Sequence, residues 1–191
     1  KECVNVFEAD GRSVPVFNDK HLSYSFDKAQ RMVAASKRLG FPMLAGSAVP
    51  VTWRLPELEL PLDCEIEEVV MVGLGDPDAH IFHTLEGLEA MVERRSGGET
   101  GVRAVQLLRG EEVWRGLDEG RWSNRLLEAA LSRCDGLQGI TLEDARPQDL
   151  LGSGVLPDIV DDPRAWIIEG NDGLQSTVLL LNGAAGNFLF A

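Results

Sequence analysis

The chain has 191 residues, and its 31 acidic residues outnumber its 18 lysines and arginines, which gives a formal net charge of -13. Nucleic acids and anionic membranes bind basic surfaces, so this charge excludes both as expected partners. Hydrophobic residues make up 44% of the sequence, enough for a buried core, and no apolar run approaches the roughly 18–20 residues of a membrane span.

Residues 1–45 predict a strand–helix–strand unit. Residues 2–9 are typical of the end of an amphipathic helix, and residues 14–17 predict a short buried strand. A helix is expected from a cap at Ser25 to Gly40, and residues 42–45 predict a second buried strand. This run has the length of a crossover connection between two parallel strands.

The remaining sequence predicts an open sheet packed with helices. A Pro-rich extended connection, residues 46–63, comes first, and residues 135–162 form a second loop-rich stretch. The other expected elements are strands at 66–74 and 102–108, helices at 81–95 and 122–134, and strands at 165–169, 176–181 and 187–190. Turn signals at residues 171–173 and 182–183 indicate an antiparallel meander of the last three strands. We therefore expect an α/β (α+β) fold with a largely antiparallel sheet.

A polar loop directly follows the first predicted strand. It contains Asp19, Lys20 and His21, and open α/β sheets bind ligands at the carboxyl ends of their strands. Lys20 could bind a substrate oxygen or polarise a carbonyl, and Asp19 would keep the ammonium charged. The alternative is an ordinary polar loop that caps the next helix.

His80, His83 and Glu86 stand three residues apart at the start of the helix expected at 81–95, and if the segment is helical from His80 they lie roughly on one face. Neutral His83 could act as a general base on a hydroxyl. Two histidines and a carboxylate could instead bind a metal ion. A third interpretation is structural, with one histidine exposed and the other hydrogen-bonded where the helix meets the sheet.

Two further segments have both a functional and a structural interpretation. The glycines of residues 93–101 could let backbone amides approach an anion, but they follow a helix, so a helix stop is favoured. Trp53 and Arg54 could line a pocket for a sugar or an acid, or could serve packing and a surface ion pair.

The three cysteines, Cys3, Cys64 and Cys134, are far apart and have neither zinc-ligand spacing nor the even number of a disulfide framework. We therefore expect no metal and a reducing, cytoplasmic location.

The run Val14–Ser23, followed by a helix and then Leu44–Gly46, resembles the glucose-fructose oxidoreductase and inositol dehydrogenase family. In that family, a Glu-Lys-Pro motif ends the Rossmann domain, and here Asp19, Lys20 and His21 stand at its three positions. Residues 82–86 look like the family helix that carries a catalytic histidine, with His83 at that position and Ala79 where the family often has aspartate. Residues 17–101 also look like an uncharacterised bacterial branch related to this family.

The resemblance implies an incomplete Rossmann-like nucleotide domain in residues 1–45 and a substrate-side, oligomerising α/β domain in residues 46–191. It implies a parent enzyme that uses NAD or NADP on a sugar- or polyol-like hydroxyl. In that enzyme Lys20 would contact the cofactor and orient the reacting oxygen, and His83 would move the proton. The expected substrate contacts are Asp19, His21, Trp53, Arg54, His80 and Glu86.

The nucleotide fingerprint Gly-x-Gly-x-x-Gly does not occur in this sequence. We therefore expect no cofactor bound to this chain and no activity of the chain alone. We also expect a homo-oligomer that forms through the C-terminal sheet, with the alternating apolar residues of 176–181 at the interface. The alternative function is a non-catalytic binding or assembly module.

Overall fold

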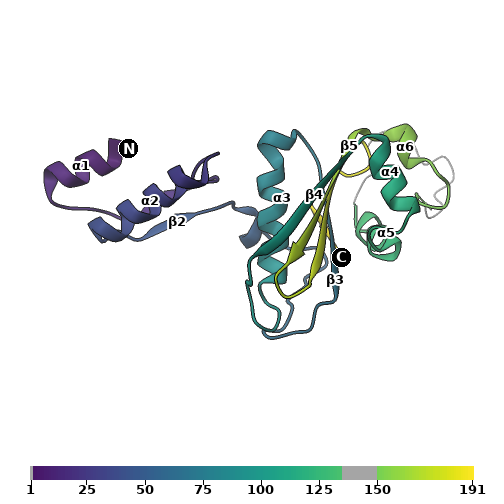
Figure 1. Ribbon diagram of the computed structural model, residues 1–191, viewed down its shortest axis with the longest axis horizontal. Coiled ribbons are helices and arrows are strands. Elements are labelled where there is room, and N and C mark those ends of the chain that lie inside the picture. Colours follow the sequence, from purple (N-terminus) through teal and green to yellow (C-terminus); the bar gives the residue numbers. More distant parts are fainter. Residues whose placement is uncertain (1, 135–149) are drawn as a thin grey trace. The chain divides into compact units, whose positions relative to one another are not determined.

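A computed structural model describes residues 2–134 and 150–191 (Figure 1). The chain forms two compact units, residues 1–51 and residues 52–191, and each is described by itself. In the described parts of both units, every helix is too short or too polar to cross a lipid bilayer.

The first unit contains the predicted crossover. Its elements are α1 (Glu2–Asp10), β1 (Val16–Asn18), α2 (Phe26–Leu39), β2 (Met43–Ala45) and the short 3₁₀ helix η1 (Val49–Val51). Strands β1 and β2 are parallel, and α2 connects them. Helix α2 ends where predicted, because Gly40 adopts a left-handed conformation with φ of 67° and its N–H bonds to the carbonyl oxygen of Ser36.

The two strands of this unit were expected to be buried, and this expectation was wrong. Phe17 and Leu44 lie opposite each other in the parallel register, and their exposed fractions are 62% and 72%. Helix α1 packs on α2, and the ring of Phe7 in α1 meets the ring of Phe41, just beyond the end of α2, edge to face. The sheet has only two short strands among the described residues, so apolar side chains stay uncovered.

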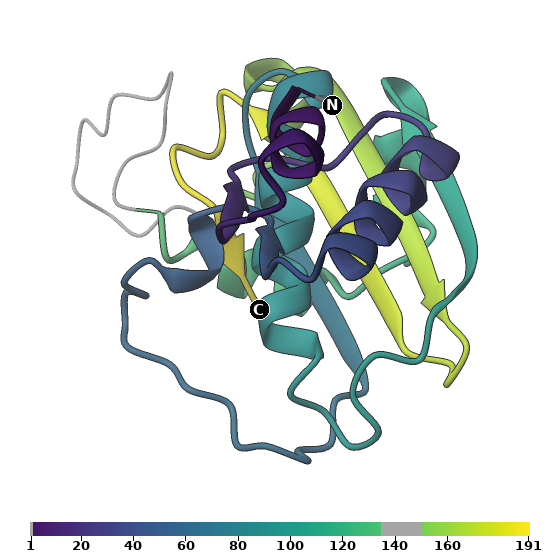
Figure 2. The ribbon, with the colours of Figure 1, turned by 90° about the vertical axis from the view of Figure 1, so that its left-hand side faces the viewer.

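The second unit is built on a five-stranded mixed sheet. Its strands have the order β4-β5-β6-β3-β7, and their bounds are β3 (Glu68–Gly73), β4 (Val102–Arg109), β5 (Asp161–Gly170), β6 (Gln175–Asn182) and β7 (Leu189–Phe190). Figure 2 shows β5 and β6 side by side as the long green and yellow strands. Only the β3–β6 pair is parallel within this sheet as described, so the expected largely antiparallel sheet is confirmed.

Helices cover both faces of this sheet (Figure 1). Helix α3 (Pro77–Val92) packs on β3 and β6 from one side, and α4 (Glu111–Asp118), α5 (Asn124–Leu131) and α6 (Leu156–Ile159) contribute to the core on the other side. This double cover explains why the central strands are continuous apolar runs instead of alternating ones: Val69 and Met71 face α3, whereas Val70 and Val72 face the opposite cluster.

Two expectations about the C-terminal strands were wrong. Strand β7 does not continue a meander, because it pairs antiparallel with β3, and β3 lies between β6 and β7. Residues 176–181 were expected at a subunit interface, but β6 is an internal strand whose residues from Ser176 to Leu181 are buried. The turn at Gly183 passes so close to Ile159 that a Cβ atom on residue 183 would lie 2.0 Å from the carbonyl oxygen of Ile159.

The sequence patterns also missed two helices and misplaced one helix start. Helix α4 follows a glycine N-cap, Gly110, and α6 is only four residues long, so both lack strong start signals. Helix α3 begins at Pro77, four residues before the expected start, because Asp76 caps it. The expected loop-rich stretch 135–162 lies partly outside the described residues.

Candidate functional site

The turn between β3 and α3 lies at the carboxyl ends of the parallel pair β3 and β6. The Asn182 side chain holds this turn: its Oδ1 accepts from the Gly75 N–H at 2.5 Å, and its Nδ2 donates to the Gly75 carbonyl at 3.2 Å. Gly75 has a φ of 94°, and a Cβ there would lie 2.6 Å from the ring of His80. The turn is therefore closed by contacts within the chain.

His80 belongs to the N-terminal cap of α3. Its Nδ1 accepts from the backbone N–H of Asp76 at 3.0 Å, while the Asp76 carboxylate accepts from the N–H groups of Asp78 and Ala79 at 2.9 and 3.1 Å. The same Nδ1 lies 3.3 Å from the Asp76 carbonyl oxygen, so either tautomer of the ring can bond to the Asp76 backbone. These contacts show how the predicted substrate residue His80 is held within its own helix end.

His83 and Glu86 are half-buried on α3, about two and three turns beyond the N-cap Asp76. The ring of His83 lies 5.6 Å from the ring of Phe82, edge to face. The three ligand atoms of His80, His83 and Glu86 do not form a metal-type group. Among the described residues, the acidic group whose ligand atoms all lie within 4.8 Å of one another is Glu89, Glu93 and Glu99.

Lys20 lies in the first unit, on the bend that follows the carboxyl end of β1. The bend is held by Asn18, whose Nδ2 donates to the Lys20 carbonyl at 2.7 Å and to the His21 carbonyl at 3.3 Å. Asp19 and His21 are exposed, and Lys20 is half-buried. The three predicted residues of this loop are thus neighbours on one bend, whereas His83 belongs to the other unit.

Trp53 and Arg54 do not form the predicted pocket wall together. Trp53 is 92% exposed, and Arg54 turns back on its own segment, where it pairs with Glu59 at 2.6 Å and donates to the Leu58 carbonyl at 3.1 Å. The structural interpretation of Arg54, an ion pair near the surface, is the one that this geometry supports.

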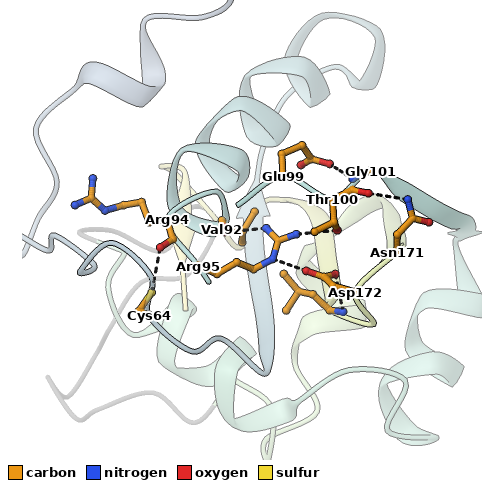
Figure 3. A network of polar contacts seen from close by, with 10 residues as sticks. Cys64, Val92, Arg94, Arg95, Glu99, Thr100, Gly101, Asn171 and Asp172 are labelled. Atoms are coloured by element: carbon orange, nitrogen blue, oxygen red, sulfur yellow. Dashed lines mark hydrogen bonds and ion pairs between the residues drawn. The ribbon is translucent and has the colours of Figure 1, made fainter. Parts of the chain in front are cut away.

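Arg95 follows α3 and lies in the segment 93–101, where sequence analysis favoured a helix stop (Figure 3). It is only 7% exposed. Its Nε donates to Asp172 at 2.8 Å, and its Nη1 and Nη2 donate to the Val92 carbonyl at 2.8 Å and to the Thr100 hydroxyl at 3.4 Å. The hydrogen bond from Arg95 lowers the pKa of the Asp172 carboxyl below its usual range.

These contacts join the loop after α3 to the β5–β6 turn. Asn171 strengthens the junction, because its Nδ2 donates to the Thr100 carbonyl at 2.7 Å and its N–H to the Gly101 carbonyl at 2.9 Å. On the other side, Ser96 donates its N–H to the Cys64 carbonyl at 2.9 Å. The helix stop favoured for residues 93–101 is therefore present. Hydrogen bonds also join the loop after this stop to two other segments, the β5–β6 turn and the segment at Cys64.

The carboxylates of Glu89, Glu93 and Glu99 gather beside this junction. Burial raises the pKa of Glu89 to about 7, with further contributions from the charge and hydrogen bond of Glu99 and from the charge of Glu93, while Arg95 acts in the opposite direction. Groups with a pKa near 7 can exchange a proton at neutral pH. We assign no metal ion to this group, because exposed acidic residues often gather without one.

One sequence signal pointed to this cluster. Glu89 and Glu93 stand four residues apart on one helix, and like charges at this spacing destabilise a helix unless the surroundings compensate. The participation of Glu99 had no such signal, because only the path of the loop brings it back to α3.

Comparison with known protein families, with curated proteins and with solved structures finds no match for the chain.

Proposed function

We propose that the chain is part of an NAD(P)-dependent oxidoreductase that acts on a sugar- or polyol-like hydroxyl. The observation that carries this proposal is the parallel β1–α2–β2 crossover with Asp19, Lys20 and His21 on the bend just beyond β1. Parallel open sheets bind their ligands at this end of the strands. In this position the Lys20 ammonium orients the substrate oxygen.

The exposed face of the β1–β2 pair supports a larger nucleotide domain. Parallel sheets are normally covered on both faces, and a two-stranded sheet is not stable alone. Phe17 and Leu44 stand exposed in adjacent positions of this face, as expected for strands that continue into a wider, covered sheet.

The described residues themselves do not fit a dinucleotide pyrophosphate. The strand–turn–helix of the second unit has two glycines, Gly73 and Gly75, but Asp76 occupies the helix N-terminus and Asn182 takes the Gly75 amide. An anion would meet a carboxylate and an engaged N–H group there. The cofactor would therefore be held elsewhere in the parent protein.

Under this proposal His83 takes the hydroxyl proton. A neutral imidazole is suited to this role near pH 7, and general acid–base catalysis contributes about 10²–10⁴-fold to a rate. Substitution H83N in the parent enzyme is expected to reduce kcat by a factor in this range, and Lys20→Met is expected to reduce it as well. Lys37→Met, which changes an exposed lysine of α2, serves as the matched control.

The direct test is a fluorescence titration with NADH and NADPH. The chain itself should bind neither tightly, and the parent protein should bind one of them and oxidise polyols in an absorbance assay. Tight binding by this chain, or a parent protein that binds neither nucleotide, contradicts the proposal.

A second candidate function, an assembly module, is favoured by the outer strand β4. Val105 is 58% exposed, and in the sheet it lies opposite Ile168 on the side of α3. Helix α3 packs on β3 and β6, so this part of the face is less covered. Light scattering should then show an oligomer that Val105→Lys dissociates and Glu128→Lys, on exposed α5 surface, does not. A strictly monomeric wild-type chain contradicts this candidate.

A further inference from the structure

The loop after α3 carries a carboxyl group back onto the helix from which it came. Glu99 lies near Glu89 and Glu93, and its Oε1 also accepts from the N–H of Gly101. Gly97, Gly98 and Gly101 all have positive φ, so the loop follows a path that glycine adopts at low cost. Contacts between acidic side chains therefore add to the bonds of Arg95, Asn171 and Ser96 that hold this loop.

The contact between Glu89 and Glu99 favours a bound proton. One carboxylate oxygen each of Glu89, Glu93 and Glu99 lies within 4.8 Å of the other two, and adjacent ionised carboxylates repel each other. The geometry therefore favours a neutral form of one member of the pair. The Oε2 atom of Glu89 is buried and has no hydrogen-bond partner in the described structure, which further disfavours a charge on this group.

No described cation near Glu89 is available to replace the proton. Arg95 is the positive group that acts on it, but its donors are directed to Asp172 of the β5–β6 turn, to Val92 and to Thr100. The other charged groups that act on Glu89 are Glu93 of α3 and Glu99 of the loop, and both are acidic. Loss of the proton would leave adjacent negative charges that are opposed by Arg95, whose Nε is already bonded to Asp172.

We propose that Glu89 and Glu99 form a proton-dependent latch between α3 and residues 96–101: a shared proton holds the loop on the helix, and its loss loosens the loop. The loosened segment includes Gly101, which precedes β4, and the Glu99 contact to its N–H. The three segments joined by Arg95 remain connected through Asp172, so the change is local.

The direction of the pH effect follows from the two states of Glu89. Its pKa is about 7 in the folded chain and its ordinary value is 4.5, so the folded state binds the proton more tightly than the unfolded state. The proton on Glu89 therefore stabilises the folded chain at acidic pH. This stabilisation is lost as the pH rises from about 4.5 to about 7, and the free energy of unfolding does not change further through this group above that pH.

The test compares thermal unfolding of wild type, Glu89→Gln and Glu128→Gln at pH 5.5 and 8.5. Glutamine mimics the protonated carboxyl, so Glu89→Gln should melt several degrees higher than wild type at pH 8.5 and higher by a clearly smaller margin at pH 5.5. Glu128 is an exposed residue of α5, and its variant should follow wild type at both pH values. The three histidines are the same in all three proteins, so their titration affects each melting temperature equally and does not change the differences between variants.

Amide hydrogen exchange gives the local readout. Above pH 7 the Gly98 amide, which donates to the Arg95 carbonyl at 2.9 Å, should lose protection relative to the Leu88 amide in wild type, and it should keep protection in Glu89→Gln. If Glu89→Gln does not fold, Glu99→Gln, on the exposed loop, tests the same pair. A Glu89→Gln effect that is equal at both pH values, or Gly98 protection that does not respond to pH, overturns the proposal.

Discussion

In the first unit Leu44 is largely exposed on a two-stranded sheet, whereas in the second unit Leu179 is completely buried in the middle of a five-stranded one. Both side chains lie on strands in a parallel pair. The difference comes from the number of layers, because helices cover both faces around Leu179. Strand sequence alone does not decide burial; the elements that pack on the strand do.

The largest expected difference between the units is in the free energy of unfolding after leucine truncation. Leu179→Ala leaves a cavity in a packed core and should cost about 2–5 kcal/mol. Leu44→Ala should change stability by less than about 0.5 kcal/mol, because the side chain is mostly exposed. Urea unfolding of the whole chain, followed by hydrogen exchange of amides in each unit, measures the change in the free energy of unfolding for both variants. A large cost for Leu44→Ala would mean that this face is covered in solution.

An intermediate difference is expected between two arginine ion pairs. Arg38 pairs with Glu8 at 2.6 Å in the first unit, where both side chains are exposed, so Arg38→Met should cost only about 0–1 kcal/mol. Arg95→Met should cost more, because it also leaves the Val92 carbonyl and Thr100 without their donor. Equal melting temperatures for the two variants would contradict the structural importance of the Arg95 junction.

The Arg95 pair also has a pH signature. The pKa of Asp172 is lowered in the folded chain, so its contribution is present above its usual value of 3.8 and is lost as the pH falls through the lower folded value. The stability gap between wild type and Asp172→Asn should therefore shrink on acidification. A gap that widens instead would have the wrong sign for this ion pair.

The smallest expected difference concerns the two helix N-caps. The Asp76 side chain accepts two backbone hydrogen bonds at the start of α3, so Asp76→Ala should cost about 0.5–2 kcal/mol. Ser25 stands at the N-cap of α2 but its side chain makes no capping bond, and Ser25→Ala should cost less. Thermal melts followed by circular dichroism compare them. The reverse order would show that cap geometry differs in solution.

Much of the secondary structure was predictable because its signals are local. Gly40 ends α2 as expected, and the 171–173 turn joins the antiparallel pair β5 and β6. The candidate residues of the β1 bend were also adjacent in sequence, so their proximity was assured. Short α4 and α6 were not found, since few residues carry their pattern.

The sequence by itself determined the element types, the acidic charge and the grouping of Asp19, Lys20 and His21, because each depends on neighbours along the chain. Only the tertiary structure decided that β3 lies between β6 and β7, that Arg95 bonds to Asp172 and that Glu99 returns to Glu89. Pairing of distant strands and burial of charges depend on which surfaces meet. The raised pKa of Glu89 follows from that packing, which no local pattern encodes.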